Sequence, residues 1–267
     1  MTRPLILTLP AIALLSACGG SGGGETGPTV VSFDPVTVEH GDDFRVETRT
    51  NGANRQVFLG GSSPSGVLTP NADKTQSVFQ SFTSSSGARQ LYEAESDLGT
   101  VSVFAIANTA GVAIAGATAE SFGGTVPTTG SASYSGEYVG FLTGSDTQSV
   151  IVGTVNLDAD FASSAIDGSI TGRERFLTSN GEKAGDMLDI DLGRHSLADG
   201  ASNPGGIATG GALGRTTVYV PESPVAGSWN VALGGEDAAV AGGTVQITHD
   251  YEIADFVETG GFAVNRN

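Results

Sequence analysis

The stretch VGTVNLDADF, from Val152 to Phe161, decides the fold class because apolar and polar residues alternate along it. Neighbouring side chains of a β-strand point to opposite faces of the sheet, so this alternation gives one apolar and one polar face. The apolar face carries Val155, Leu157, Ala159 and Phe161, and the polar face carries Thr154, Asn156, Asp158 and Asp160. The period of two predicts a half-buried strand that covers a core.

The same period recurs outward from this stretch. Within Ala165–Arg175 it places Arg173 on the polar face, and within Asp186–Leu192 it places Leu188 on the apolar face and Met187 on the polar face. Further strands complete a set of eight between Ser131 and the C-terminus: Ser131–Leu142, Ile207–Val220, Gly227–Leu233, Gly243–Thr248 and Gly260–Asn265. Eight antiparallel strands are about the number that closes a barrel with a side-chain-filled interior.

The first half of the chain has weaker alternation. Strands are expected at Phe44–Thr48, Gln56–Leu59, Val78–Phe82 and Val101–Ala107. Proline and glycine interrupt the pattern at residues 126–130, which predicts a domain boundary there. The predicted fold is therefore all-β, with an eight-stranded antiparallel up-and-down β-barrel over residues 127–267 and a smaller, irregular β-rich region over residues 30–126. The single helical candidate is Glu236–Ala241.

The N-terminus has the pattern of an export signal. Arg3 precedes an apolar stretch, Leu5–Leu15, which is too short for a membrane-spanning helix. The sequence Leu15-Ser16-Ala17-Cys18 then resembles the lipobox of bacterial lipoproteins, and Cys18 is the one cysteine of the chain. The resemblance implies that residues 1–17 are a signal peptide and that Cys18 is acylated. The alternative is an ordinary secretory signal with a chance cysteine.

The resemblance also implies an address. Two or three acyl chains on Cys18 give stable membrane attachment, and the Gly-rich residues 18–29 form a flexible tether. Because Gly19 stands where an aspartate would retain a lipoprotein in the inner membrane, the expected location is the outer membrane of a Gram-negative bacterium. Exposure at the cell surface and a periplasmic orientation both remain open.

Motifs in the second half resemble a known family. A Tyr134-Ser135-Gly136 strand, Gly227-Ser228-Trp229 and the glycine-rich stretch from Ala238 to Val245 follow one another in order. Over about Pro127 to Val264 this resembles the C-terminal β-barrel of transferrin-binding protein B-like surface lipoproteins. The resemblance implies a single-lobe, non-enzymatic binding protein. Transferrin binding is not carried over, because no partner-binding residue of that family can be matched here.

Charge and cysteine content exclude some classes of protein. The chain has 29 acidic and 12 basic residues, a formal net charge of −17, so its surface repels nucleic acid. One cysteine permits no internal disulfide, and the fold depends on its core. The densest basic spot, Arg173-Glu174-Arg175, is expected to form exposed pairs with neighbouring acidic strands.

No catalytic, metal-binding or cofactor-binding constellation is expected. The histidines are scattered without metal-ligand spacing, and we expect them in exposed turns. Four aspartates on two strand faces could approach one another as a Ca²⁺ site or a glycosidase pair, but a solvated polar face is the expected reading. The residues weighed are His40, His195 and His249, and Asp158, Asp160, Asp189 and Asp191. The ligand-binding residues stay unassigned.

The leading hypothesis is an outer-membrane-anchored lipoprotein that binds an extracellular protein or small ligand without enzymatic activity, in nutrient or iron acquisition. Its other partner is the membrane, through the acyl chains on Cys18. The alternatives are a structural envelope lipoprotein or adhesin, and a carbohydrate-active enzyme that uses the aspartates. A porin-like barrel is disfavoured because one tryptophan and five tyrosines cannot form two aromatic girdles.

Overall fold

The computed structural model describes residues 30–48, 53–59, 67–71, 78–107, 113–144, 148–198, 201–202, 206–209, 226–251 and 254–267. The regular structure in these residues is β-strand apart from one short 3-10 turn, which confirms the predicted all-β class. The helical candidate Glu236–Ala241 holds that turn, Glu236–Ala238, and then enters a strand.

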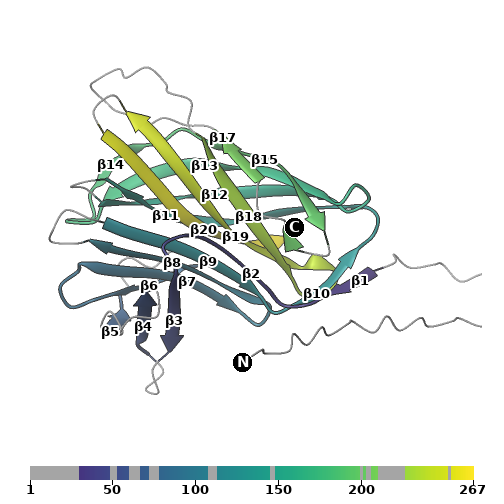
Figure 1. Cartoon of the computed structure of the whole chain (residues 1–267), viewed down its shortest axis with the longest axis horizontal. Helices are drawn as coiled ribbons and strands as arrows, with labels where there is room; N and C mark the ends of the chain where they lie inside the picture. Colours follow the sequence, from purple (N-terminus) through teal and green to yellow (C-terminus); the bar gives the residue numbers. More distant parts are fainter. Residues whose placement is uncertain are drawn as a thin grey trace, which may run out of the picture.

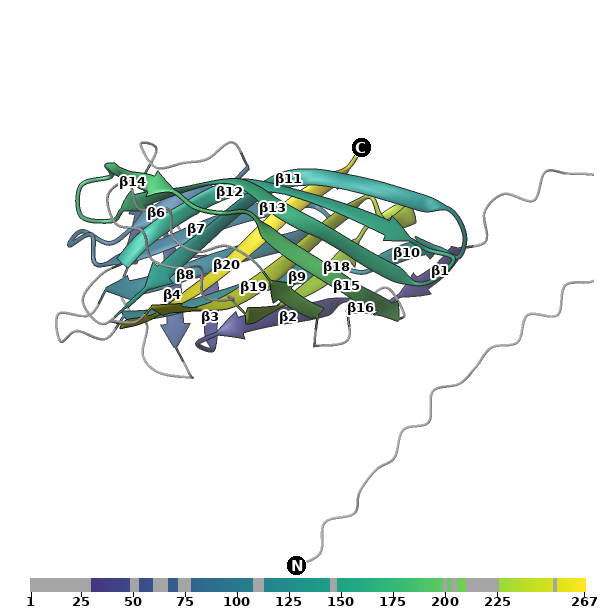
Figure 2. The same ribbon diagram turned by 90° about the horizontal axis from the view of Figure 1, so that it is seen from above.

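The second half of the chain is an antiparallel meander (Figure 2). Pairing passes from each long strand to the next, and β20 pairs back with β11, so the strands form a ring that we call the barrel. Its strands are β11 (Ser131–Thr143), β12 (Gln148–Asp160), β13 (Ala165–Leu177), β15 (Ile190–Ala198), β17 (Gly206–Thr209), β18 (Ala226–Gly234), β19 (Val240–Tyr251) and β20 (Ala254–Arg266).

The ring is continuous but uneven. Between β15 and β17 only Asp191↔Thr209 and Leu192↔Ala208 pair, whereas β11 and β12 pair along their whole length. Two short strands lie beside the ring, β14 (Lys183–Asp186) on β13 and β16 (Ala201–Ser202) between β15 and β18. The part of the predicted strand Ile207–Val220 that follows Thr209 lies outside the described residues.

The sequence pattern predicted an irregular β-rich region for the first half. The structure shows instead an eight-stranded antiparallel sheet, which we call the handle sheet. Its order is β2-β9-β8-β7-β6-β5-β4-β3. The strands are β2 (Val36–Gly41), β3 (Phe44–Thr48), β4 (Arg55–Leu59), β5 (Val67–Pro70), β6 (Gln80–Thr83), β7 (Arg89–Ser96), β8 (Gly99–Ala107) and β9 (Ala113–Ser121).

Two strands of the handle sheet that the sequence pattern did not predict, β7 and β9, lack a clear period of two for a physical reason. Residues Gln90–Ala94 of β7 are all buried, and β9 presents mainly alanines to its core side. A strand that is covered on both faces has no polar face to reveal it, and small alanines give a weak apolar signal.

A two-stranded ribbon joins the two halves. β1 (Val30–Phe33) pairs with β10 (Gly124–Pro127), and β10 is followed directly by β11. The proposed boundary at residues 126–130 therefore falls where the chain leaves this ribbon for the barrel. Both views place the ribbon at one end of the molecule (Figures 1 and 2).

The interior of the barrel is filled by large side chains. Trp229, Tyr134, Tyr138 and Phe262 are all at most 1% exposed and belong to one apolar cluster. Glycine makes this filling possible, because a Cβ on Gly260 would lie only 2.3 Å from the Tyr138 hydroxyl oxygen. The barrel is a packed core and not an open channel.

One face of the handle sheet covers the outer wall of the barrel (Figure 1). Val101 and Val103 of β8 share a buried cluster with Val139 and Phe141 of β11. The contact is close because Gly261 has no side chain: a Cβ there would lie 2.8 Å from Val101 and 2.9 Å from Val103. The two halves therefore share a buried apolar cluster.

Candidate functional site

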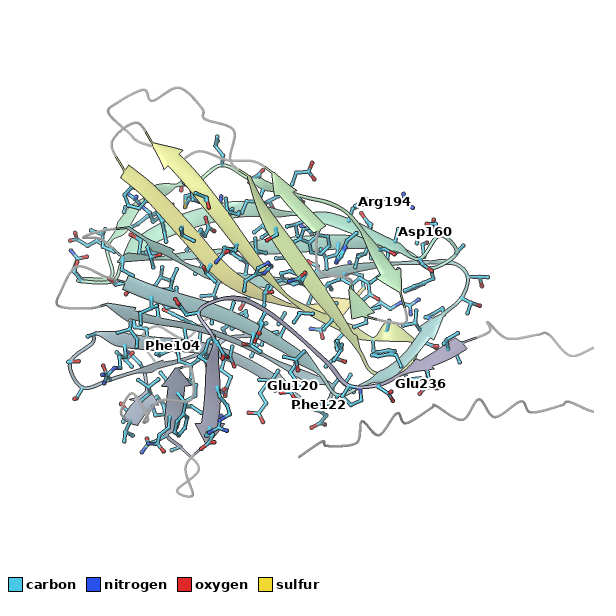
Figure 3. All side chains as sticks on the ribbon, viewed as in Figure 1. Phe104, Glu120, Phe122, Asp160, Arg194 and Glu236 are labelled. Atoms are coloured by element: carbon cyan, nitrogen blue, oxygen red, sulfur yellow. The ribbon has the colours of Figure 1, made fainter. Side chains whose placement is uncertain are left out.

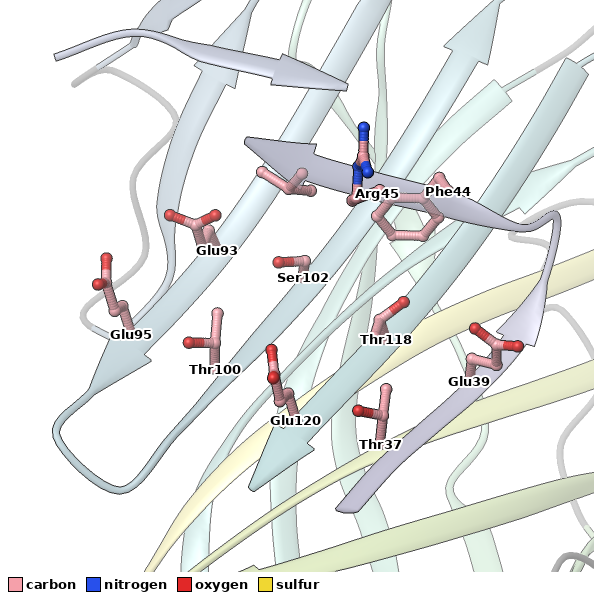
Figure 4. Close-up of a pocket in the computed structure, with 11 residues that line it drawn as sticks. Thr37, Glu39, Phe44, Arg45, Glu93, Glu95, Thr100, Ser102, Thr118 and Glu120 are labelled. Atoms are coloured by element: carbon pink, nitrogen blue, oxygen red, sulfur yellow. The ribbon is translucent and has the colours of Figure 1, made fainter. Parts of the chain in front are cut away.

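A groove of about 360 Å³ lies on the opposite face of the handle sheet (Figure 4). Strand parity places it there: Val101 and Val103 point to the barrel, so Thr100 and Ser102 point away from it. We call it the handle groove, and its lining residues are Thr37 and Glu39 of β2, Phe44, Arg45 and Val46 of β3, Glu93 and Glu95 of β7, Thr100 and Ser102 of β8, and Thr118 and Glu120 of β9.

The groove is the uncovered end of this face. Strands β3 to β5 fold over the rest of it and enclose a small apolar cluster that includes Phe44, Leu91 and Phe104. The Phe44 and Phe104 rings lie 5.6 Å apart, centroid to centroid, and Phe44 also lines the groove. Beyond Phe44 the groove is lined mainly by polar side chains (Figure 4).

The deepest carboxylate of the groove is paired. Glu93 accepts a hydrogen bond from Arg55 Nε at 2.7 Å, and a second nitrogen of Arg55 lies 3.4 Å from Glu95. Burial raises the pKa of Glu93, and the hydrogen bond from Arg55 opposes that shift only in part. Glu95 has an exposed side chain, so Arg55 bridges one buried carboxylate and one solvated carboxylate.

Two rim carboxylates have no such partner. Glu39 and Glu120 are exposed, and neither makes an ion pair with a described residue. Arg45, which also lines the groove, is paired with Glu47 at 2.8 Å. The groove therefore carries an excess of negative charge at its opening.

The signal for this groove was present in the sequence. Four strands carry polar residues two positions apart around a small apolar residue, as in Thr37-Val38-Glu39 and Thr118-Ala119-Glu120. These polar residues share one face only once the order of the strands is known. Because β2 meets β9 through long-range pairing, the local pattern could not place Thr37 and Glu39 beside the polar residues of β7, β8 and β9.

A second polar cluster is enclosed in the barrel. Glu258 of β20 is ion-paired with Arg173 of β13, lies 2.9 Å from Nε2 of His249 on β19, and accepts a 2.7 Å hydrogen bond from the hydroxyl of Tyr138 on β11. We call these four residues the barrel cluster. Burial on its own would raise the pKa of Glu258, but the Arg173 charge and the His249 hydrogen bond lower it to about 2.

The barrel cluster corrects two predictions. Arg173 was placed on the polar face and its ion pairs were expected to be exposed, yet its side chain is fully buried. The cause is a bulge: pairing between β12 and β13 shifts between Val152 and Thr154, opposite Gly172 at φ +60°. An extra residue in one strand reverses the parity that follows it, and this turns Arg173 inward. A glycine inside the strand was the available signal.

The chemistry of the barrel cluster is structural. All four residues are at most 1% exposed, so the Glu258 carboxylate is not accessible from the surface of the described chain. Burial raises the pKa of Tyr138 well above its usual value, which keeps the phenol protonated as a donor to Glu258. The cluster ties β11, β13, β19 and β20 together across the interior.

The histidines are not the exposed turn residues that were predicted. His249 is in the barrel cluster, and His195 is buried with its ring edge against Trp229, 5.4 Å between centroids. His40 of β2 is half-buried against the barrel wall, where its ring nitrogens each lie 2.9 Å from a hydroxyl, of Thr244 and of Ser228. Burial lowers the pKa of both His40 and His195.

The aspartates of the barrel are solvated, as the polar-face interpretation predicted. Asp158, Asp160, Asp189 and Asp191 are all exposed. Strand β13 separates the β12 pair from Asp191, so the four do not converge. Asp160 accepts hydrogen bonds from Ser163, which lower its pKa, at the barrel end that carries Arg194 (Figure 3).

One strand register differs from its prediction. Leu188 was assigned to the apolar face and Met187 to the polar face, whereas Leu188 is 45% exposed and Met187 is buried. The chain leaves regular pairing between β14 and β15, so the alternation restarts at Ile190.

The described residues offer neither a metal-type cluster nor a membrane-spanning helix. No group of three or more His, Cys, Asp or Glu side chains is placed to hold a metal ion. None of the described helices has the length and hydropathy that a membrane crossing requires. Cys18 and the tether lie outside the described residues, so the lipidation stays a prediction.

Comparison with solved structures identifies the fold. The chain is similar to transferrin binding protein B from Haemophilus parasuis, with a TM-score of 0.50 and 11% identity over 88% of this chain and 45% of that one. The protein from serogroup B Neisseria meningitidis gives 0.47 and 14% over 88% and 43%, and an intact Ap-TbpB with N and C lobes gives 0.46 and 13% over 92% and 48%. No family model and no curated protein matches the sequence.

The fold is therefore that of a single lobe of a transferrin binding protein B. The chain spans less than half the length of those proteins, which agrees with one lobe. The resemblance predicted for Pro127 to Val264 is confirmed at the level of fold. Its extent was underestimated, since 88% coverage takes in the handle sheet as well as the barrel.

Proposed function

We propose that this chain is an outer-membrane-anchored lipoprotein that binds a protein partner on its outer surface, without enzymatic activity, in nutrient or iron acquisition. The observation that carries the proposal is the difference between the filled interior of the barrel and the open face of the handle sheet. The barrel interior is filled by side chains such as Trp229 and Phe262, whereas the handle sheet leaves one face open as a groove. Among the described residues, a partner therefore has outer surfaces to bind and meets a barrel interior that is already filled.

Rigidity supports a role in binding. The handle sheet and the barrel share a buried apolar cluster, and His40 adds hydrogen bonds between them. A surface that is already ordered loses less conformational entropy when a partner binds. Such a unit suits the presentation of the handle face to another protein.

The proposed anchor suits this arrangement. Residues 1–17 would be removed, Cys18 would carry the acyl chains, and residues 19–29 would link it to β1. An extended chain of about 11 residues reaches roughly 35–40 Å. Because β1 lies in the ribbon at one end of the molecule, away from β3 to β5, the tether would leave the β3 to β5 part of the handle sheet clear (Figure 1).

The test is a comparison of the wild-type chain with Cys18→Ala in a Gram-negative host. We expect the wild type in the outer-membrane fraction, where protease added to intact cells cleaves it, and Cys18→Ala in the soluble fraction. Chemical crosslinking on intact cells should then join the wild type to a protein partner. Outer-membrane retention of Cys18→Ala would contradict the anchor, and a wild type that crosslinks to no protein would contradict the binding role.

A further inference from the structure

We propose that the handle groove binds the lysine or arginine side chains of a basic segment in a partner protein. This inference rests on the proposed function, since it names the chemistry of the partner that the exposed face would take. It is carried by the charge of the rim, an aromatic wall and a buried hydroxyl that has no partner in the described chain.

Charge comes first. Glu39 on β2 and Glu120 on the neighbouring strand β9 face the same opening and make no ion pair with a described residue. The two arginines near the groove are already engaged, Arg55 with Glu93 and Glu95 and Arg45 with Glu47. An incoming cation therefore meets carboxylates that are not yet neutralised, on a chain of net charge −17.

The apolar wall matches the rest of such a side chain. Phe44 is buried but lines the groove, and Val46 lies beside it on β3. A lysine or arginine lays its methylene stem along apolar surface while its charged head seeks carboxylates, and a ring face attracts the cation itself. A hydrated metal ion gains no favourable contact from apolar side chains, and no metal-type cluster occurs among the described residues.

Ser102 is the independent sign of a ligand. Its side chain lines the groove, the residue is 6% exposed, and its hydroxyl makes no hydrogen bond to a described residue. Figure 4 shows it between the strands that carry Glu93 and Thr118. A hydroxyl that is largely buried and has no partner in the described chain is available to a ligand, and an ammonium or guanidinium group supplies N–H donors from which its oxygen accepts hydrogen bonds.

The test uses the full-length chain in detergent micelles and a fluorescein-labelled peptide of alternating lysine and glycine, followed by fluorescence anisotropy at low salt. The groove variant is Glu39→Gln/Glu120→Gln. Its matched control is Asp158→Asn/Asp191→Asn, which removes the same charge from exposed positions on the barrel. We expect the groove variant to bind the peptide at least tenfold more weakly and the control to bind within twofold of wild type.

Equal weakening by the two double variants would overturn the inference, because general acidity would then explain the binding. Ser102→Ala provides a second reading that does not depend on charge, with an expected loss of about threefold. Unlabelled spermidine separates a free polyamine from a protein segment. If it displaces the peptide at the peptide's own concentration, the assignment to a partner protein is overturned.

The outcome is separable from that of the proposed function. If the wild type crosslinks to a protein on cells and Glu39→Gln/Glu120→Gln crosslinks equally well, the groove inference fails while the binding role stands. If Cys18→Ala is retained in the outer membrane, the anchor fails while peptide binding by the groove is unaffected.

Discussion

The barrel and the handle sheet each hold a glutamate paired with an arginine, and the two pairs differ in what surrounds them. In the barrel, Arg173 and Glu258 have fully buried side chains, with His249 and Tyr138 completing the set. In the handle, Arg55 and Glu93 keep 10% and 7% side-chain exposure at the inner edge of the groove. The same chemistry serves to hold strands together in one place and lies beside an open surface in the other.

The enclosure decides the energetic role. A charged side chain inside the barrel cannot be solvated by water if its partner is lost, so each member of the barrel cluster depends on the others. A charge at the groove can regain solvent or exchange one partner for another. The barrel cluster is therefore a structural element, whereas the groove is the place where a charged side chain can exchange partners.

The largest effect is expected from breaking the enclosed pair. Arg173→Met leaves Glu258 buried without its main counter-charge, and the free energy of unfolding should fall by about 3–5 kcal/mol. Arg55→Met should cost less, about 1–3 kcal/mol, because Glu93 lies near solvent. Urea denaturation followed by circular dichroism measures both, and equal losses would contradict the distinction between the two pairs.

A double variant serves as the control for that measurement. Arg173→Met/Glu258→Gln removes both charges and leaves an amide that His249 and Tyr138 can still reach. Its loss should be smaller than the sum of the two single losses, since the residues act on one interaction. An additive result would show that Arg173 stabilises the barrel by packing alone.

The two glutamates should have opposite effects on the pH dependence of the free energy of unfolding. The pKa of Glu258 is lowered to about 2 from 4.5, so its contribution is present above 4.5 and is lost as pH falls from 4.5 towards 2. The pKa of Glu93 is raised above 4.5, so the folded state binds its proton more tightly than the unfolded state. The stability that this proton contributes is present below pH 4.5 and decreases as the pH rises from 4.5 through the raised pKa.

Denaturation midpoints over pH 2–7 test these signs. Glu258→Gln should flatten the acid limb, and Glu93→Gln should flatten the region just above pH 4.5, each on a background of lower stability. Loss of the acid limb in Glu93→Gln, with an unchanged limb in Glu258→Gln, would reverse the assignment of the two environments.

The period of two predicted the barrel well, because most of its strands have one apolar and one solvated face. Val155, Leu157 and Ala159 are buried while Asn156 and Asp158 are exposed, as their alternation indicated. In the handle sheet the predicted strands at β3, β4, β6 and β8 are confirmed, whereas β7 escaped prediction because it is covered on both sides and carries no such contrast.

Both polar sites depend on features that local alternation does not contain. The bulge at Gly172 turns Arg173 inward, and only the closing of the ring brings Glu258 to it. The groove needs β2 and β9 to lie side by side although Glu39 and Glu120 are far apart in the chain. Long-range pairing, rather than residue type, was the missing information.

A smaller effect is expected at the contact between the two regions. His40→Ala leaves the hydroxyls of Thr244 and Ser228 without their ring nitrogens, at a cost of about 1–2 kcal/mol. The apolar cluster between Val101 and Val139 remains, so the handle sheet and the barrel should still unfold in one transition. Calorimetry that resolves two transitions in the wild type would contradict the shared core.

The smallest effect is expected on the outer face of the barrel. Asp158 and Asp191 are exposed and make no ion pair with a described residue, so Asp158→Asn and Asp191→Asn should each change the free energy of unfolding by less than about 0.5 kcal/mol. A loss of several kcal/mol would mean that these carboxylates are enclosed in the way that Glu258 is. Because β13 keeps them apart, we expect instead that the two changes add independently, as solvated charges on separate strands do.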